Sequence, residues 1–309
     1  MEINNLEIAK TIGQPIDASL PVPVEITAIC DLDTAEFGED VYHFSAYDNN
    51  VDTVYTANDS GEVVSNKKSP SGATQLTFVG LQSDLAYVTL NELQDAKDQT
   101  ALARKKAAIT RSMDKNEVKR ALDLLLGIGS QEVELAAADD IYSGIMAMVH
   151  KVTDYGDKFV LLCGSTVWEK INSFERDKES SFAYRLSIEE MLKKFGVEII
   201  KVVGSVQLDG GGSLPVLLAT KAILVAMDSK LKAGKPMIFV RRRINPEVAA
   251  QLGIPADAAE RLITTIGGLQ VINNHSNILG FGVVGYECNV LAVTNYLATC
   301  WCDELTNPA

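Results

Sequence analysis

The feature that most constrains this chain is a long, polar β segment that runs directly into a helical one. Residues 41–90 alternate apolar and polar side chains in short runs such as 41–47 and 75–79. Turn-forming clusters, among them residues 48–50 and 69–72, separate the runs. A two-stranded ribbon of this kind is marginally stable alone and leaves unpaired edges. It therefore needs cover, and a neighbouring copy of the same protein is the simplest source.

Composition restricts the class of protein further. The 309 residues are enough for one large domain or two interleaved ones. A hydrophobic content of 47% with 22% charged residues is typical of a globular protein. The net charge of −13 argues against a surface that grips nucleic acid, because such a surface needs clustered Lys and Arg. An acidic wall can still enclose nucleic acid while repelling its phosphates.

The five cysteines and the start of the chain indicate the compartment. The cysteines are odd in number and irregularly spaced, which favours a reducing environment. The first residues lack the basic stretch and apolar run of a secretory signal. The most apolar stretch, residues 216–227, is interrupted by Lys221 and is too short to span a bilayer. We therefore expect a soluble intracellular protein.

A long helical rod is predicted after the β segment. Residues 95–113 are rich in Ala, Lys, Arg and Gln, which are good helix formers. Asp114 is a candidate N-cap with Glu117 at the capping-box position, and Gly127 is a candidate end. This pattern predicts a second helix that begins at Asp114. Together the two helices make a scaffold with a narrow apolar face.

A mixed α/β domain is predicted next, and strands follow it. Residues 159–163 indicate a buried strand, and residues 141–152 carry the apolar stripe of a helix. Residues 266–302 again have the residue pattern of β-strands. Because the rod precedes this domain and strands follow it, we expect an α/β domain inserted into an outer, elongated one.

The glycine triplet Gly210, Gly211 and Gly212 has two interpretations. A phosphate-binding loop would require a helix directly after the glycines, where backbone N–H groups point at the anion. The residues that follow have the pattern of another strand instead. A flexible turn is therefore expected, since glycine is the usual residue for strained turns.

No local motif predicts catalysis, a cofactor or a metal. Cys300 and Cys302 point to one face of a strand, but a metal site needs two further ligands, so packing is expected. Ser165 follows a strand and opens a helix, yet Val167 stands where a nucleophile elbow has its second glycine. The three histidines form no helical ligand pair. A soluble α/β enzyme whose site is built from residues distant in sequence is the competing class.

The one basic cluster is the run Arg241, Arg242 and Arg243. Guanidinium groups pair readily with carboxylates and phosphates. Contact with acidic groups of a neighbouring subunit is the preferred hypothesis, and binding of nucleic acid or another anion is the alternative.

The order of these elements resembles the major capsid proteins of tailed bacteriophages, which share the Hong Kong 97-type fold. The strand-then-helix opening in residues 158–168 and the closing strand in residues 286–295 are similar to that family. The resemblance implies an α+β fold with an extended β loop, a spine helix near residues 92–113 and an inserted α/β axial domain. The implied division is an N-terminal arm at 1–36, the extended β loop at 37–83, the spine helix and first part of the peripheral domain at 84–130, the axial domain at 131–240, and a return to the peripheral domain at 241–309.

The resemblance also implies a function. It predicts a structural, non-enzymatic shell protein that self-assembles as hexamers and pentamers into an icosahedral virion capsid around double-stranded DNA, without sequence-specific binding or a membrane. Expected partners are scaffolding, portal and cement proteins, with assembly in the host cytoplasm. The glycine triplet would form the axial-loop tip, and Lys67 and Lys68 would join the three arginines in intersubunit contacts. Encapsulin-like nanocompartments and ring-forming phage proteins are the alternatives.

The ribbon can be tested by proteolysis. Lys67 and Lys68 lie beside a turn-prone cluster, so trypsin should cut there quickly in unassembled protein and slowly in particles. Deletion of residues 48–72 should leave the α/β domain folded and abolish assembly. Intact particles formed by the deletion variant would contradict the role given to the ribbon.

Overall fold

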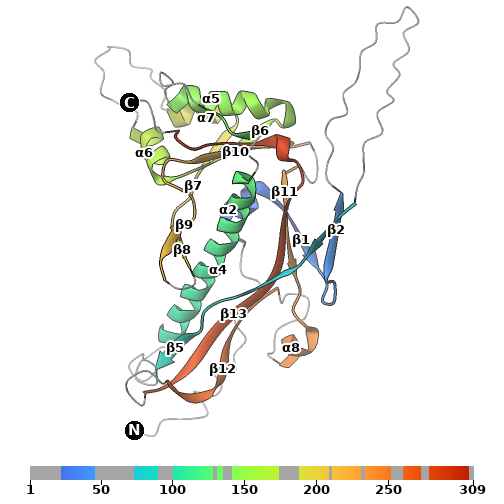
Figure 1. The fold of residues 1–309 in the computed structure, drawn as a ribbon, viewed down its shortest axis with the longest axis vertical. Helices are drawn as coiled ribbons and strands as arrows, with labels where there is room; N and C mark the ends of the chain where they lie inside the picture. Colours follow the sequence, from blue (N-terminus) through green and yellow to red (C-terminus); the bar gives the residue numbers. More distant parts are fainter. Residues whose placement is uncertain are drawn as a thin grey trace, which may run out of the picture.

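The computed structural model is elongated, and its two largest β-sheets lie one above the other along the long axis, as Figure 1 shows. A single long helix, α4 (Thr100–Leu126), runs from the lower sheet to the upper one. The structure describes residues 22–45, 73–89, 100–127, 131–134, 141–173, 188–208, 211–230, 234–251, 260–272 and 278–305.

The lower sheet has six strands and draws on both halves of the sequence. Its main path is β1 (Cys30–Ala35), β11 (Met237–Arg242), β13 (Ile278–Val293) and β12 (Arg261–Ile272). The short strands β4 (Val79–Gln82) and β5 (Ala86–Thr89) also pair with β13. Only the β1–β11 pair is parallel, and the other pairs are antiparallel. The sixteen-residue β13 is therefore the strand on which this sheet is assembled.

The upper sheet has four strands, in the order β14 (Thr299–Cys302), β10 (Ala222–Met227), β6 (Lys158–Cys163) and β7 (Val197–Lys201). Helices α5 (Ile141–Val152), α6 (Ser165–Ser173) and α7 (Ile188–Lys194) pack on one face. The end of α4 and the short α2 (Val24–Ile29) pack on the other face. Both faces of the sheet are thus covered.

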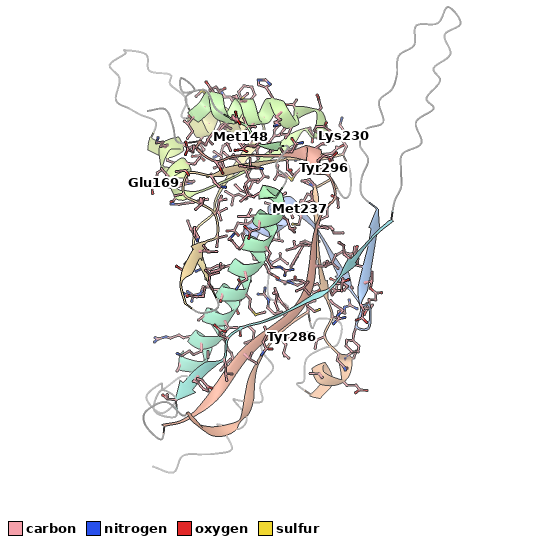
Figure 2. The ribbon with its side chains drawn as sticks, in the orientation of Figure 1. Met148, Glu169, Lys230, Met237, Tyr286 and Tyr296 are labelled. Carbon is pink, nitrogen blue, oxygen red and sulfur yellow. The ribbon has the colours of Figure 1, made fainter. Side chains whose placement is uncertain are left out.

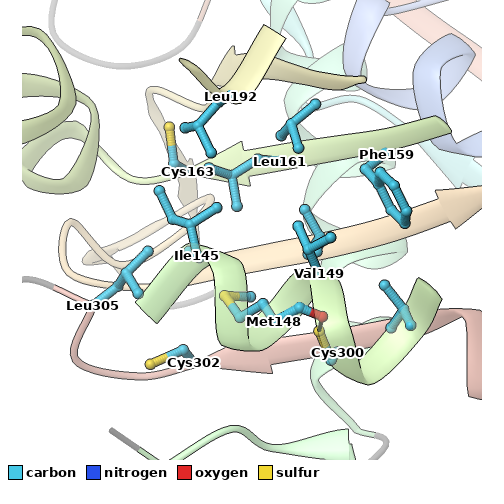
Figure 3. Packing of buried hydrophobic residues seen from close by; sticks show 14 of the residues in the cluster. Ile145, Met148, Val149, Phe159, Leu161, Cys163, Leu192, Cys300, Cys302 and Leu305 are labelled. Carbon is cyan, nitrogen blue, oxygen red and sulfur yellow. Dashed lines mark hydrogen bonds between the residues drawn. The ribbon is translucent and has the colours of Figure 1, made fainter. Parts of the chain in front are cut away.

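Strand β6 shows why its sequence is almost continuously apolar. Phe159 and Leu161 point toward α5 in the cluster drawn in Figure 3, whereas Val160 and Leu162 belong to the core beside α4. Successive side chains of a strand point to opposite faces, so a strand covered on both sides needs apolar residues at every position. Each such side chain stabilises the fold by about 1.5–3 kcal/mol relative to an exposed one. The prediction of a buried strand here is confirmed.

The remaining described elements are short. They are the ribbon strands β2 (Val41–Ser45) and β3 (Ala73–Thr77), the hairpin strands β8 (Ser205–Gln207) and β9 (Ser213–Pro215), helix α8 (Pro246–Gln251), and the 3₁₀ turns η2 (Thr153–Tyr155) and η3 (Tyr296–Ala298).

Helix α4 corrects the expectation of two helices. It is continuous over 27 residues, so Asp114 lies in its middle and does not cap a new helix. The Asp114 carboxylate instead lies 2.6 Å from Nη1 of Arg261 on β12. The helix also approaches β13 closely, since a Cβ added to Gly285 would lie 2.5 Å from Sδ of Met113. Contacts along the whole rod therefore override the local capping signal.

The mixed α+β class is confirmed, but the sheets do not follow the expected sequence ranges throughout. Strand β14 lies in residues 241–309, yet it pairs with β10 in the upper sheet. Strand β1 lies in the expected arm, yet it pairs with β11 in the lower sheet. The local pattern of apolar and polar residues identifies such strands, but it does not identify the strands with which they pair. The division of the chain into arm, loop and domains stays a prediction.

A buried polar core joins α4 to the lower sheet. Glu117 of α4 lies 3.0 Å from Nη2 of Arg241 on β11 and 2.9 Å from Nη2 of Arg261 on β12. Arg261 Nε also lies 2.5 Å from Glu287 on β13. Asn289 donates a hydrogen bond to Glu287 at 2.9 Å. All five side chains are buried, so the helix is bonded to three strands at once.

The electrostatics of this core are balanced. Burial, together with the charge of Glu287, raises the pKa of Glu117 to about 7, although Arg241 and Arg261 oppose the shift. Burial lowers the pKa of Arg261, but the carboxylates of Glu117 and Glu287 outweigh it and raise that pKa overall. With Asp114 and Arg120 included, three acids face three arginines. Loss of one partner would leave a buried charge without compensation.

Replacement of Glu117 tests this core. Glu117→Ala should lower the free energy of unfolding by about 3–5 kcal/mol, the usual cost of breaking a buried ion pair. Glu169, an exposed residue of α6, provides the control, and Glu169→Ala should change stability by less than about 0.5 kcal/mol. Urea unfolding of the isolated subunit measures both. Equal effects of the two substitutions would contradict the role assigned to Glu117.

Candidate assembly surfaces

Two arginines of the basic cluster attach the base of the ribbon to the lower sheet. Arg242 Nη1 lies 2.9 Å from Oδ1 of Asp40, and it also donates to the backbone oxygen of Glu39 at 3.2 Å. Arg243 forms an ion pair with Glu36. These bonds therefore attach the turn between β1 and β2 to the C-terminal end of β11.

An apolar cluster completes this attachment. Ala35, Phe78, Val240, Cys288 and Val290 are buried together, and side chains from both ribbon strands pack against them. The Arg242 guanidinium lies over the ring of Phe78, 5.5 Å from its centroid. The described strands β2 and β3 thus start from a fixed base, as Figure 1 shows.

The three arginines meet acidic groups, as expected, but the acids belong to the same chain. Arg241 is only 2% exposed and lies in the polar core, so the prediction that it contacts a neighbouring subunit is wrong. Arg242 and Arg243 keep partly exposed side chains, and their intersubunit contact stays a prediction. Lys67 and Lys68 lie outside the described residues.

The glycine turn is found at the tip of the β8–β9 hairpin. Gly211 and Gly212 have φ values of +91° and +108°, a region that favours glycine, and both are exposed. They precede β9, so the prediction of a turn between strands is confirmed. Gly210 lies outside the described residues, and the role of the triplet as an axial-loop tip stays a prediction.

Large apolar side chains are exposed on both halves of the molecule. They include Phe37 in the β1–β2 turn, Leu208 and Leu214 at the hairpin, and Tyr286 and Tyr296, which Figure 2 labels. Exposed apolar groups that gather on one surface are typical of protein contacts. Among the described residues, no helix has both the length and the apolar content needed to cross a membrane.

A cavity of about 300 Å³ lies beside β1. Thr34 and Glu260, which line it, are hydrogen-bonded to each other at 2.9 Å. Arg241, also on its wall, is held by Glu117. Thus none of these three polar side chains on the cavity wall is left without a partner. Within the described part of the chain, no cluster of three potential metal ligands occurs either.

The cysteines pack in the core, as expected for Cys300 and Cys302. Both lie on β14 and face the cluster under α5, as Figure 3 shows. All five cysteines are buried and free. Burial raises the pKa of Cys300 and that of Cys163 to about 12, and it raises the pKa of Cys302 as well. These thiols are therefore protonated and unreactive at neutral pH.

Sequence reasoning missed the acids that hold the arginines and the partners of Glu117. Arg261, Glu287 and Asn289 lie on β12 and β13 and form most of the polar core. The sequence signal that could have found them is a charged residue in a strand that is otherwise apolar, because a buried charge must be paired. That signal identifies the residues but not which ones meet.

Comparison with solved structures relates the whole chain to shell proteins. No protein-family model and no curated protein matches the sequence. The structure is similar to a phage-related protein of Bordetella bronchiseptica, with 12% identity, a TM-score of 0.56 and 93% of each chain covered. It is also similar to the capsid structure of cyanophage P-SCSP1u, with 10% identity, a TM-score of 0.51, and coverage of 92% of this chain and 89% of that one.

A third similar structure is a virus-like particle from Pyrococcus furiosus, with 13% identity and a TM-score of 0.50. It covers 97% of this chain and 100% of that one. The match extends over nearly the full length in each case, so it includes both sheets and the connecting helix. The chain therefore has the Hong Kong 97-type fold.

Thiol labelling tests the buried state of the cysteines. A thiol with a pKa of about 12 has a thiolate fraction at pH 8 that is roughly a thousandfold smaller than that of a free cysteine. The native protein should therefore react very slowly with a thiol reagent, whereas urea should expose all five thiols. Rapid labelling of the native protein, followed by peptide mapping to Cys300 or Cys302, would contradict the packing.

Proposed function

We propose that this protein is the structural subunit of an icosahedral phage capsid that encloses double-stranded DNA. The observation that carries the proposal is similarity of fold to a phage capsid over 92% of this chain, whose ribbon starts from a fixed base at one side of the molecule. The subunit has no enzymatic role in this proposal.

The interior of the subunit and its surface differ in how their side chains are partnered. The charged side chains buried between α4 and the lower sheet form ion pairs within the chain. Apolar side chains such as Phe37, Leu208 and Leu214 remain exposed on separate edges of the molecule. A subunit of this kind gains stability from association, because burial of apolar surface contributes roughly 25 cal/mol per Å².

The proposed assembly has defined partners. Copies of the chain would associate as hexamers and pentamers, and scaffolding, portal and cement proteins would act with them in the host cytoplasm. The net charge of −13 supports enclosure of DNA without tight or sequence-specific binding. In the finished virion an acidic wall would repel the packaged phosphates and leave the DNA free to move.

A shell without a viral genome is the second candidate. The similarity to a virus-like particle from Pyrococcus furiosus favours it, since that fold match covers all of the other chain. An encapsulin-like nanocompartment would have the same walls around a protein cargo. A ring-forming phage protein and a soluble α/β enzyme are smaller assemblies that sedimentation separates from either shell.

Expression of the protein with any required scaffold should yield closed, hollow particles. Electron microscopy would reveal their shape, and sedimentation should place them in the megadalton range. A ring of a few to tens of subunits would sediment at hundreds of kilodaltons. Subunit contacts in an obligate assembly such as a shell bury about 2,000–5,000 Å² each. Only monomers or dimers under these conditions would contradict the proposal. The ultraviolet spectrum of particles from infected or native cells would separate a DNA cargo from a protein cargo.

A further inference from the structure

The exposed half of α4 is basic in an otherwise acidic chain. Between residues 100 and 115 five basic residues accompany one acidic residue, Asp114, although the whole chain has 28 basic and 41 acidic residues. Arg104, Arg111 and Lys115 are spaced by seven and four positions, so they share one face of the helix. The opposite face, with Met113, packs on the lower sheet.

This basic face has no acidic partner among the described residues. Arg104 and Arg111 are exposed, and no ion pair within the described part of the chain includes them or Lys115. Farther along α4 the same side of the helix is covered, because Leu122 is buried under the upper sheet. On this side of the helix the uncovered part is thus the N-terminal half.

Exposed leucines border the basic face. Leu208 and Leu214 of the β8–β9 hairpin are each 45% exposed. The hairpin lies against α4, since a Cβ added to Gly204 would lie 2.9 Å from Cε of Lys115. We define Arg104, Arg111, Lys115, Leu208 and Leu214 as the α4 patch. It combines positive charge with apolar area.

A surface of matching chemistry occurs on the same chain. Residues 31–40 contain five acidic residues and no basic one. At the β1–β2 turn Phe37 is 48% exposed, Asp40 is 88% exposed and Glu39 is exposed beside them. We define Phe37, Glu39 and Asp40 as the acidic turn. Arg242 pairs with Asp40 and Arg243 pairs with Glu36, so ion pairs fix the position of this turn on the lower sheet.

The two surfaces lie on opposite sides of the molecule. In Figure 1 the lower half of α4 and the β8–β9 hairpin lie at the left, whereas the turn between β1 and β2 lies at the right. Complementary patches on opposite sides of one subunit cannot meet within that subunit. They produce head-to-tail association, which closes into a ring when the rotation between copies allows it.

We propose that the acidic turn of one copy docks on the α4 patch of the next copy. Phe37 would contact Leu208 and Leu214, and Glu39 and Asp40 would face Arg104 and Arg111. This contact deepens the proposed shell function and rests on it. A second copy fits better than nucleic acid, because phosphate contact would use the arginines but would leave the exposed leucines without apolar contact.

Charge reversal on each side tests the contact. In R104E/R111E like charges would oppose one another across the contact, which should lower the assembled fraction by roughly tenfold or more. E39R should act in the same direction while it keeps the Asp40–Arg242 ion pair that holds the turn. E39R combined with R104E/R111E in one chain should restore assembly in part. K158E/K194E changes the same charge at exposed positions of the upper domain and should assemble like the wild type. Sedimentation measures oligomers of every size, and thermal unfolding verifies that each variant is folded.

A crosslinking arm detects the contact directly. The native cysteines are buried, so a bismaleimide should join Glu39→Cys in one copy to Arg111→Cys in another and give a covalent dimer on mixing. Normal assembly of R104E/R111E, no rescue in the combined variant, or no crosslinked dimer would each overturn the proposal. Particles of R104E/R111E that form normally but contain less nucleic acid would assign the patch to nucleic acid instead. Cysteine-variant oligomers that give the crosslink but never close into particles would support this contact and contradict the shell.

Discussion

The structure depends on one buried carboxylate. Glu117 lies between Arg241 and Arg261, and these three residues come from elements that are far apart in the sequence. Apolar faces tolerate sliding, because dispersion and hydrophobic contacts have little directional preference. Ion pairs at 2.9–3.0 Å are directional, so they specify one position of α4 over the strands β11 and β12. The rest of the molecule is built around a helix held in this way.

Once α4 is fixed, its two halves have different surroundings. The C-terminal half is covered along the face that carries Leu122 and Leu125, which are buried between the two sheets. The N-terminal half uses only one face, through Ile109 and Met113, and leaves its basic face exposed. One rod therefore joins the two sheets and also presents an exposed basic face.

The arginine cluster illustrates how neighbours in sequence receive different tasks. Strand alternation directs Arg241 toward α4 and its carboxylate, and Arg242 toward the opposite face and Phe78. Arg243 follows the strand and pairs with Glu36. The first arginine thus stabilises the core, and the other two orient the ribbon and the acidic turn. A single basic run thus serves both the buried core and an exposed turn of the same chain.

The sequence by itself determined the local secondary structure of this protein: an alternating ribbon, a helical rod, a buried strand at residues 159–163 and a turn at the glycine triplet. These features are local, because alternation, helix propensity and turn chemistry act over a few residues. Only the tertiary structure decided which charges meet. Asp114 and Glu117 have the spacing of a capping box, yet they bond Arg261 across the core and the helix continues. A carboxylate can pair with any arginine that the fold brings near, so the partner is decided by long-range packing and not by spacing.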